Sequence, residues 1–85
     1  YIKSIILNRK LKLIWDFRGP NAEKTAAHHE IHLKEYITNQ TAEVFKTAHE
    51  VLNEYHTITY IVVKEEDMKL FRDQLKPHRG EWLDN

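Results

Sequence analysis

The sequence predicts an α+β domain, in which an antiparallel sheet carries two helices on one face. Within residues 11–17 the large apolar side chains of Leu11, Leu13, Trp15 and Phe17 recur at every second position, which is the pattern of a strand with one buried face. Residues 22–37 place apolar side chains in one stripe at about 100° per residue, which is the pattern of an amphipathic helix. Residues 56–64, "HTITYIVVK", are dense in β-branched and aromatic residues, as is typical of a central strand.

A chain of 85 residues has apolar surface for one core, so residues 1–85 are expected to form a single domain. Domains of this size are only marginally stable alone, and a homodimer is therefore the expected state. The sequence has no cysteine, which excludes disulfides, thiolate metal sites and a cysteine nucleophile, and which fits a cytoplasmic protein.

Charge and hydropathy exclude two classes of partner. Thirteen basic residues balance thirteen acidic ones, so the broad basic surface of a nucleic-acid-binding protein is missing. No stretch approaches the roughly 20 apolar residues of a transmembrane helix. We expect neither a nucleic-acid nor a membrane partner.

The first elements are strands. From residue 11 the side chains of Leu11, Leu13, Trp15 and Phe17 point to one face, which predicts a strand with its aromatic face inward. The Ile- and Leu-rich residues 2–7 are expected to pair with it as a hairpin.

"RGPNA" ends this strand and begins a helix. Gly19 and Pro20 break the extended chain, Asn21 is a suitable N-cap, and Glu23 suits the first helical turn. The helix is expected to end at residue 38 or 39. Its inward stripe is formed by Ala22, Ala26, His29, Leu33, Tyr36 and Ile37.

Residues 41–55 allow two interpretations. As a helix they have an apolar stripe that includes Val44, Ala48 and Val51, and a third helix would then replace a strand. As a strand they turn at Asn53-Glu54 into residues 56–64. We prefer the strand, because it makes the sheet wide enough to cover two helices.

The second predicted helix covers residues 65–76, with acidic residues in its first turn, and Pro77 ends it. Its inward stripe is Met68, Phe71 and Leu75. In the remaining residues 78–85, Trp82 and Leu83 are expected to form a last short strand or to pack on a partner subunit.

In element order and length, most of the chain resembles ferredoxin-like domains, including the small dimeric α+β barrel families. The sequence contains no motif specific to one family. The resemblance therefore implies a fold and no activity.

"HHEIHLKEY", residues 28–36, places three histidines on the first helix. His28 and His32 are four residues apart and lie on one flank, so their nitrogens can approach one divalent metal ion such as zinc. The pattern is one residue short of the zinc-protease motif H-E-x-x-H, which excludes that enzyme class. His29 belongs to the inward stripe and is expected to be either a neutral, hydrogen-bonded core residue or a buried acid–base group.

The strand interpretation of residues 41–55 adds two histidines. A turn at Asn53-Glu54 sets His49 opposite Ile58, so that His49, His56 and Tyr60 share one sheet face. We expect the first helix to cover that face. The expected result is a histidine-lined pocket, formed by His28, His29, His32, His49, His56 and Tyr60.

Two further segments suggest anion binding. Arg18 lies just before the first helix, where a guanidinium and backbone N–H groups favour a carboxylate or phosphate, although pairing with Asp16 or Glu23 is the alternative. In "KPHRGEW", Arg79-Gly80 forms either an anion-binding turn or a simple change of direction.

The sequence thus predicts a small domain that binds a ligand or partner and has no identifiable activity. The candidate surface is the histidine-lined pocket with Arg18. One alternative is a metal-dependent or histidine-dependent enzyme that uses the same pocket. A second is a structural module for homodimerisation.

Overall fold

The computed structural model describes residues 9–83 and has the element order β1, α2, β2, β3, α3, β4. The strands are β1 (Lys10–Arg18), β2 (Val44–Asn53), β3 (His56–Lys64) and β4 (Arg79–Leu83). The helices are α2 (Ala22–Thr38) and α3 (Met68–Leu75), and a single 3-10 turn, Glu65–Asp67, precedes α3. The predicted strand at residues 2–7 lies outside the described residues.

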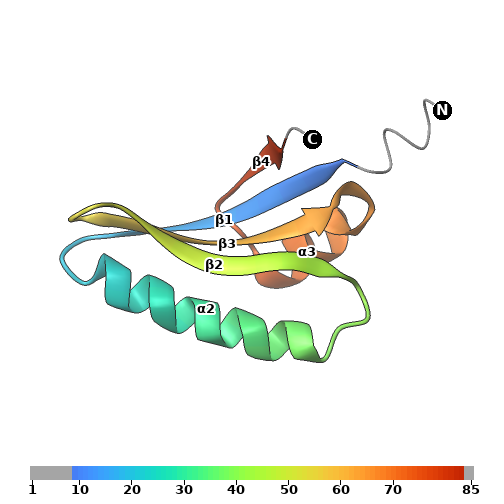
Figure 1. Ribbon diagram of the computed structural model, residues 1–85, viewed down its shortest axis with the longest axis horizontal. Coiled ribbons are helices and arrows are strands. Elements are labelled where there is room, and N and C mark those ends of the chain that lie inside the picture. The colour runs from blue at the N-terminus through green and yellow to red at the C-terminus, as the bar shows by residue number, and fades with distance from the viewer. Residues whose placement is uncertain (1–8, 84–85) are drawn as a thin grey trace.

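The four strands form one antiparallel sheet in the order β2-β3-β1-β4 (Figure 1). The preferred strand interpretation of residues 41–55 is therefore confirmed, and the third helix considered there is wrong. The strand forms because β3 offers it a long antiparallel partner, which supplies hydrogen bonds that local helix propensity does not outweigh. This strand order is consistent with a ferredoxin-like arrangement.

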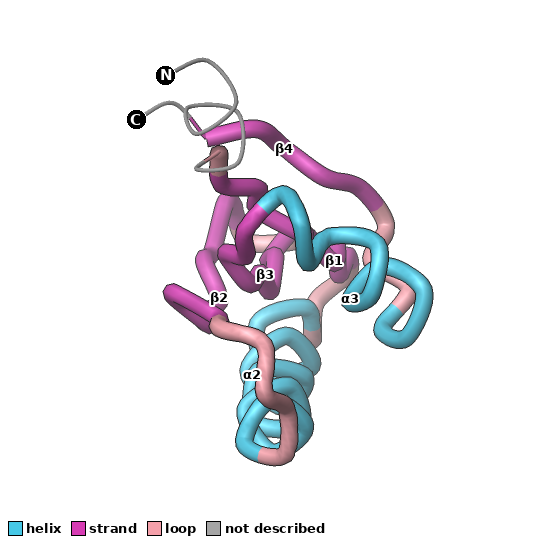
Figure 2. Tube along the Cα trace, turned by 90° about the vertical axis from the view of Figure 1, so that its right-hand side faces the viewer, coloured by secondary structure: helices cyan, strands magenta, loops and turns pink. Residues whose placement is uncertain are grey.

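Both helices lie on the same face of the sheet, as the sequence predicted (Figure 2). The core between the layers combines alternate residues of β1 and β3 with the inward stripes of the helices. We call this face of the sheet the helix face. Its buried core residues are Leu11, Leu13, Trp15, Leu33, Ile61, Val63 and Phe71.

A hydrogen bond from the central strands holds each helix in place. The Thr59 hydroxyl of β3 donates to the Ala26 carbonyl of α2 at 2.7 Å, in a fully buried position. The small side chains of Ala22 and Ala26 permit this close approach. The indole N–H of Trp15 in β1 donates to the carbonyl of Leu75 at the end of α3, at 3.2 Å.

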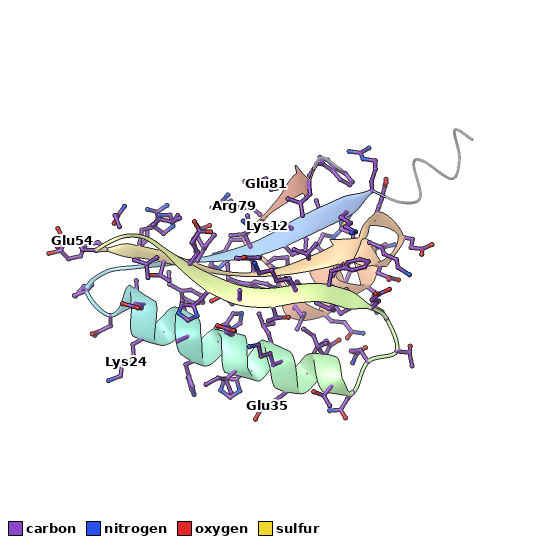
Figure 3. All side chains as sticks on the ribbon, viewed as in Figure 1. Lys12, Lys24, Glu35, Glu54, Arg79 and Glu81 are labelled. Atoms are coloured by element: carbon purple, nitrogen blue, oxygen red, sulfur yellow. The ribbon has the colours of Figure 1, made fainter. Side chains whose placement is uncertain are left out.

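Within residues 9–83 the opposite face carries no helix, and we call it the open face. Its apolar centre consists of Ile14, Ile58, Tyr60 and Val62, each at most 9% exposed. Long polar side chains cover this centre: the Lys12 ammonium lies 4.2 Å from the centroid of the Tyr60 ring. Figure 3 shows Lys12, Arg79 and Glu81 together on the side of the sheet away from α2.

Two local predictions are corrected. Asn21 precedes α2 but makes no side-chain capping bond, because its backbone (φ −104°, ψ 16°) is outside the extended region from which a cap reaches back. The β2–β3 turn is Glu54-Tyr55 rather than Asn53-Glu54, since the Asn53 side chain accepts the Tyr55 N–H at 2.9 Å and so stands before the turn.

The helix ends follow the sequence closely. α2 ends at Thr38, within the predicted range. α3 ends at Leu75, and Lys76 adopts the left-handed conformation (φ 53°) before Pro77, which cannot continue the helix. Within residues 9–83 no helix has both the length and the hydropathy to cross a bilayer.

We expect Phe71→Ala to lower the free energy of unfolding by about 3–5 kcal/mol, because the ring is fully buried between α3 and the sheet and its removal leaves a cavity. Urea unfolding followed by circular dichroism measures this change. The control is Leu70→Ala at the preceding position, where the side chain is 41% exposed and the expected loss of unfolding free energy is below about 1 kcal/mol. Equal losses in the two variants would contradict the described packing.

Candidate functional site

A groove of about 350 Å³ lies between β4 and the side of α3 that carries Met68 and Arg72. It is within the size range of small-ligand sites, which begins at roughly 300 Å³. Its lining residues come from β1, α3, β4 and the segment that joins the last two: Leu11, Leu13, Met68, Arg72, Pro77, His78, Arg79, Gly80 and Trp82.

The groove has an apolar floor because of Gly80. This residue pairs with Leu13, and a Cβ atom built on it would lie 3.6 Å from Leu11 Cδ1 and 3.7 Å from Leu13 Cδ2. Glycine therefore leaves open a space that almost any other side chain would occupy. The short helix α3 covers the next part of the sheet, and Pro77 turns the chain away from it.

The polar groups of the groove are basic or neutral. Arg72 and His78 belong to its lining, and none of the described lining residues is acidic. Arg72 makes one weak contact with Asp73 at 3.4 Å, in which both side chains are about half exposed. Trp82 is 46% exposed, and the guanidinium of Arg9 stacks 3.8 Å from its ring centroid.

Asp16 holds the segment that carries these groups. Its carboxylate accepts two hydrogen bonds from Arg79, at 2.9 and 3.1 Å, and its backbone N–H donates to Nδ1 of His78 at 2.9 Å. The same carboxylate lies 2.7 Å from Nε2 of His56 in β3. One residue of β1 thus joins β3, β4 and the loop before β4.

The carboxylate at this junction stays ionised. Hydrogen bonding from Arg79, and then from His56, outweighs partial burial and lowers the pKa of Asp16 to about 2. The same contact raises the pKa of the Arg79 guanidinium. Arg79 is therefore engaged with Asp16 on the open face, which leaves Arg72 and His78 as the polar groups available to a molecule in the groove.

The predicted histidine-lined pocket required His49 and His56 to lie on the same face of the sheet, and that assignment is wrong. The turn at Glu54-Tyr55 and a bulge between Val51 and Asn53 set His49 opposite Thr59, on the helix face, while His56 shares the open face with Ile58 and Tyr60. A register difference of one residue reverses the face of a side chain. His49 and His56 are therefore on opposite sides of the sheet.

Each of these two histidines has a carboxylate partner of its own. His49 Nδ1 lies 2.5 Å from Glu30 of α2, which also pairs with Lys34 at 2.7 Å. Both contacts lower the pKa of Glu30, with His49 contributing more. His56 of β3 pairs with Asp16 of β1. The His49–Glu30 contact therefore joins β2 to α2, and the His56–Asp16 contact joins β3 to β1.

His29 packs in the core side of α2, as predicted. Its ring contacts Trp15 and Phe17 edge-on, with centroid separations of 5.0 and 5.4 Å. Burial is the main cause that lowers the pKa of His29, and the nearby His32 and His78 lower it further. The neutral imidazole is therefore favoured. Its buried Nε2 atom has no hydrogen-bond partner among residues 9–83, in contrast to the expected bond to a carbonyl or carboxylate.

His28 and His32 are exposed on the outer surface of α2, with their ring centroids 4.5 Å apart. His32 also lies 3.4 Å from Glu35. Over residues 9–83, no group of three or more histidine, aspartate or glutamate side chains is arranged to hold a metal ion. Zinc binding by the two imidazoles of His28 and His32 therefore stays a prediction.

Arg18 is exposed at the end of β1, paired in register with His56. Its expected partner Asp16 bonds to Arg79 instead, because β4 brings that guanidinium alongside β1. The segment "KPHRGEW" was the sequence signal for the groove. Its position beside Leu11 and Leu13 depends on the pairing of β4 with β1, which the sequence did not predict.

Comparison with protein-family models, with curated proteins and with solved structures finds no match for this chain.

Stability should fall in acid partly through Asp16. Its pKa in the folded protein, about 2, is below the usual 3.8, so its ion pair contributes fully above about pH 4 and is lost as the pH falls through 2. Asp16→Asn should lower the free energy of unfolding by about 2 kcal/mol at pH 7. It should also reduce the change of this free energy with pH between pH 4 and 2. Urea unfolding across this pH range, with the exposed Asp73→Asn as control, measures it; an unchanged slope would contradict the assignment.

The zinc prediction can be checked on the folded protein. Two imidazoles give weak binding, so millimolar Zn²⁺ should raise the thermal midpoint by a few degrees, and either His28→Ala or His32→Ala should abolish the rise. Lys24→Ala on the same helix is the control and should leave it unchanged. A rise that persists in both histidine variants would place the zinc elsewhere.

Proposed function

We propose that this chain is a binding domain whose groove between α3 and β4 takes a small molecule with an apolar body and a carboxylate. The observation that carries this proposal is the apolar floor beneath Gly80 combined with a rim of Arg72 and His78, with no acidic residue among the lining residues that the structure describes. The ligand-binding role expected from the sequence is thereby assigned to a different surface.

The apolar part of the ligand is matched by the floor and by one wall. Leu11 and Leu13 form the floor, and the half-exposed Trp82 ring, on one face of which Arg9 stacks, forms a wall against which an aromatic or aliphatic body can pack. Burial of the exposed Trp82 surface and of the ligand's own apolar surface contributes roughly 25 cal/mol per Å² of apolar area.

The charged part of the ligand is matched by Arg72. A guanidinium binds a carboxylate through two parallel hydrogen bonds, and its only ion-pair contact within the described residues is the weak one to Asp73. His78 accepts the Asp16 N–H through Nδ1, so its other nitrogen, Nε2, carries the proton and can donate to the same carboxylate. The two donors favour an anion over a neutral molecule of the same shape.

Catalysis by a histidine pocket has less support. The two part-buried imidazoles with carboxylate partners, His49 and His56, lie on opposite faces of the sheet. His29 is packed against Trp15 and Phe17, and its buried Nε2 has no hydrogen-bond partner in the part of the chain that the structure describes. Ferredoxin-like topology serves many activities and does not favour an enzyme here.

Titration with 2-naphthoate, followed by Trp fluorescence and by calorimetry, tests the proposal. We expect saturable binding at one site per chain, and binding of 2-naphthalenemethanol, the neutral analogue, that is weaker by on the order of tenfold. Gly80→Val should abolish binding of both, because its side chain fills the floor while its backbone suits a β-branched residue.

Arg72→Gln separates charge from shape. It should remove the preference for the carboxylate and leave the neutral analogue bound as before. Lys69→Gln, an exposed change on the same helix, is the matched control and should bind both compounds like the wild type. The proposal fails if neither compound binds the wild type, or if Gly80→Val, with an unaltered circular dichroism spectrum, still binds 2-naphthoate.

A further inference from the structure

The edge of the sheet formed by β2 is long and has one neighbour. β2 has ten residues and pairs only with β3, so its other edge presents backbone N–H and C=O groups without strand partners in the part of the chain that the structure describes. Such an edge is a template for another strand unless the protein blocks it. The other edge strand, β4, has five residues and is a much smaller template.

Exposed apolar side chains gather along this same edge. Of the seven large hydrophobic residues that are exposed within residues 9–83, four belong to β2 and its turn, and the other three are spread over α2, α3 and β4. The four are Phe45 (40% exposed), Val51 (48%), Leu52 (44%) and Tyr55 (58%). A concentration of this kind indicates an interaction surface rather than chance exposure.

We infer that β2 pairs antiparallel with β2 of a second copy of this chain, about a two-fold axis at Ala48, to form a continuous eight-stranded sheet. In this register Lys46 stands opposite Glu50 of the partner subunit, and Thr47 stands opposite His49 of the partner subunit. Both pairs occur twice because the interface is isologous. Opposite charges that face each other across two strands stabilise their pairing.

The charges select both the register and the occupant. Directly opposed residues must point to the same face, so the nearest alternative registers shift the strands by two positions. Those registers place Glu50 against Val44, or Lys46 against Leu52, and lose both ion pairs. Because Lys46 and Glu50 are symmetric about Ala48 within one segment, the edge is complementary to itself.

The ends of this segment are also defined. Irregular pairing with β3 occurs between Val44 and Lys46 and again between Val51 and Asn53, so residues 46–51 form one regular stretch between two bulges. Bulges bend a strand and limit further pairing. The inferred interface is therefore short, and it does not depend on the groove at the opposite side of the sheet.

Sedimentation velocity at several protein concentrations tests the inference. The wild type should be a dimer, while Lys46→Glu and Glu50→Lys should each dissociate more readily, by on the order of tenfold, because like charges then face each other twice. The double variant K46E/E50K should restore the wild-type dimer. Lys69→Glu on the outer surface of α3 makes the same charge change away from the edge and should have no effect.

Amide hydrogen exchange gives a second measurement that needs no variant. Dilution below the dissociation constant should speed the exchange of amides in residues 45–51 and leave those of the central strand β3 unchanged. A monomeric wild type at high concentration overturns the inference. So does a dimer that both single variants leave intact, or one whose β2 amides exchange equally fast before and after dilution.

Discussion

The antiparallel pairing of β1 with β3 is the contact on which the rest of the structure depends. It joins nine residue pairs from Lys10–Lys64 to Arg18–His56 and sets which side chains of each strand face the helices. Both interlayer hydrogen bonds start from this pair of strands, from Thr59 to α2 and from Trp15 to α3. If the register moved by one residue, both bonds and the apolar face beneath the helices would be lost together. The central pair therefore determines where the helices dock as well as how the sheet forms.

Alternation along β1 also explains why its second face can carry a polar junction. The odd-numbered residues enter the core, so Asp16 points to the open face, where β3 supplies His56 and β4 supplies Arg79. Because a carboxylate that is only 16% exposed is costly unless it is paired, Asp16 favours the arrangement in which β4 lies beside β1. That arrangement sets Gly80 above Leu11 and Leu13 and so creates the groove. The ionic junction and the apolar groove are two consequences of one strand pairing.

The histidines illustrate where local patterns stop being informative. The helical period of residues 22–37 correctly assigned His29 to the packed side of α2 and His28 and His32 to its exposed flank. For His49 and His56 the same kind of reasoning failed, because their faces depend on one turn residue and one bulge. The Asn53 side chain, which bonds the Tyr55 N–H, moves the turn by a single position. A pattern with a period of two has no tolerance for such a shift.

By itself, the sequence determined the fold class, the two helices with their inward stripes, and the inward face of β1, because these follow from side-chain periodicity within one segment. It also identified "KPHRGEW" as a segment of interest without giving it a location. Only the tertiary structure decided which charged groups meet and which edge stays open. Asp16 finds Arg79 across 63 residues of chain, and β2 becomes an edge because β3 lies between it and β1. Contacts of this kind depend on strand order and register, which are set by the packing of the whole sheet and are not encoded in any one segment.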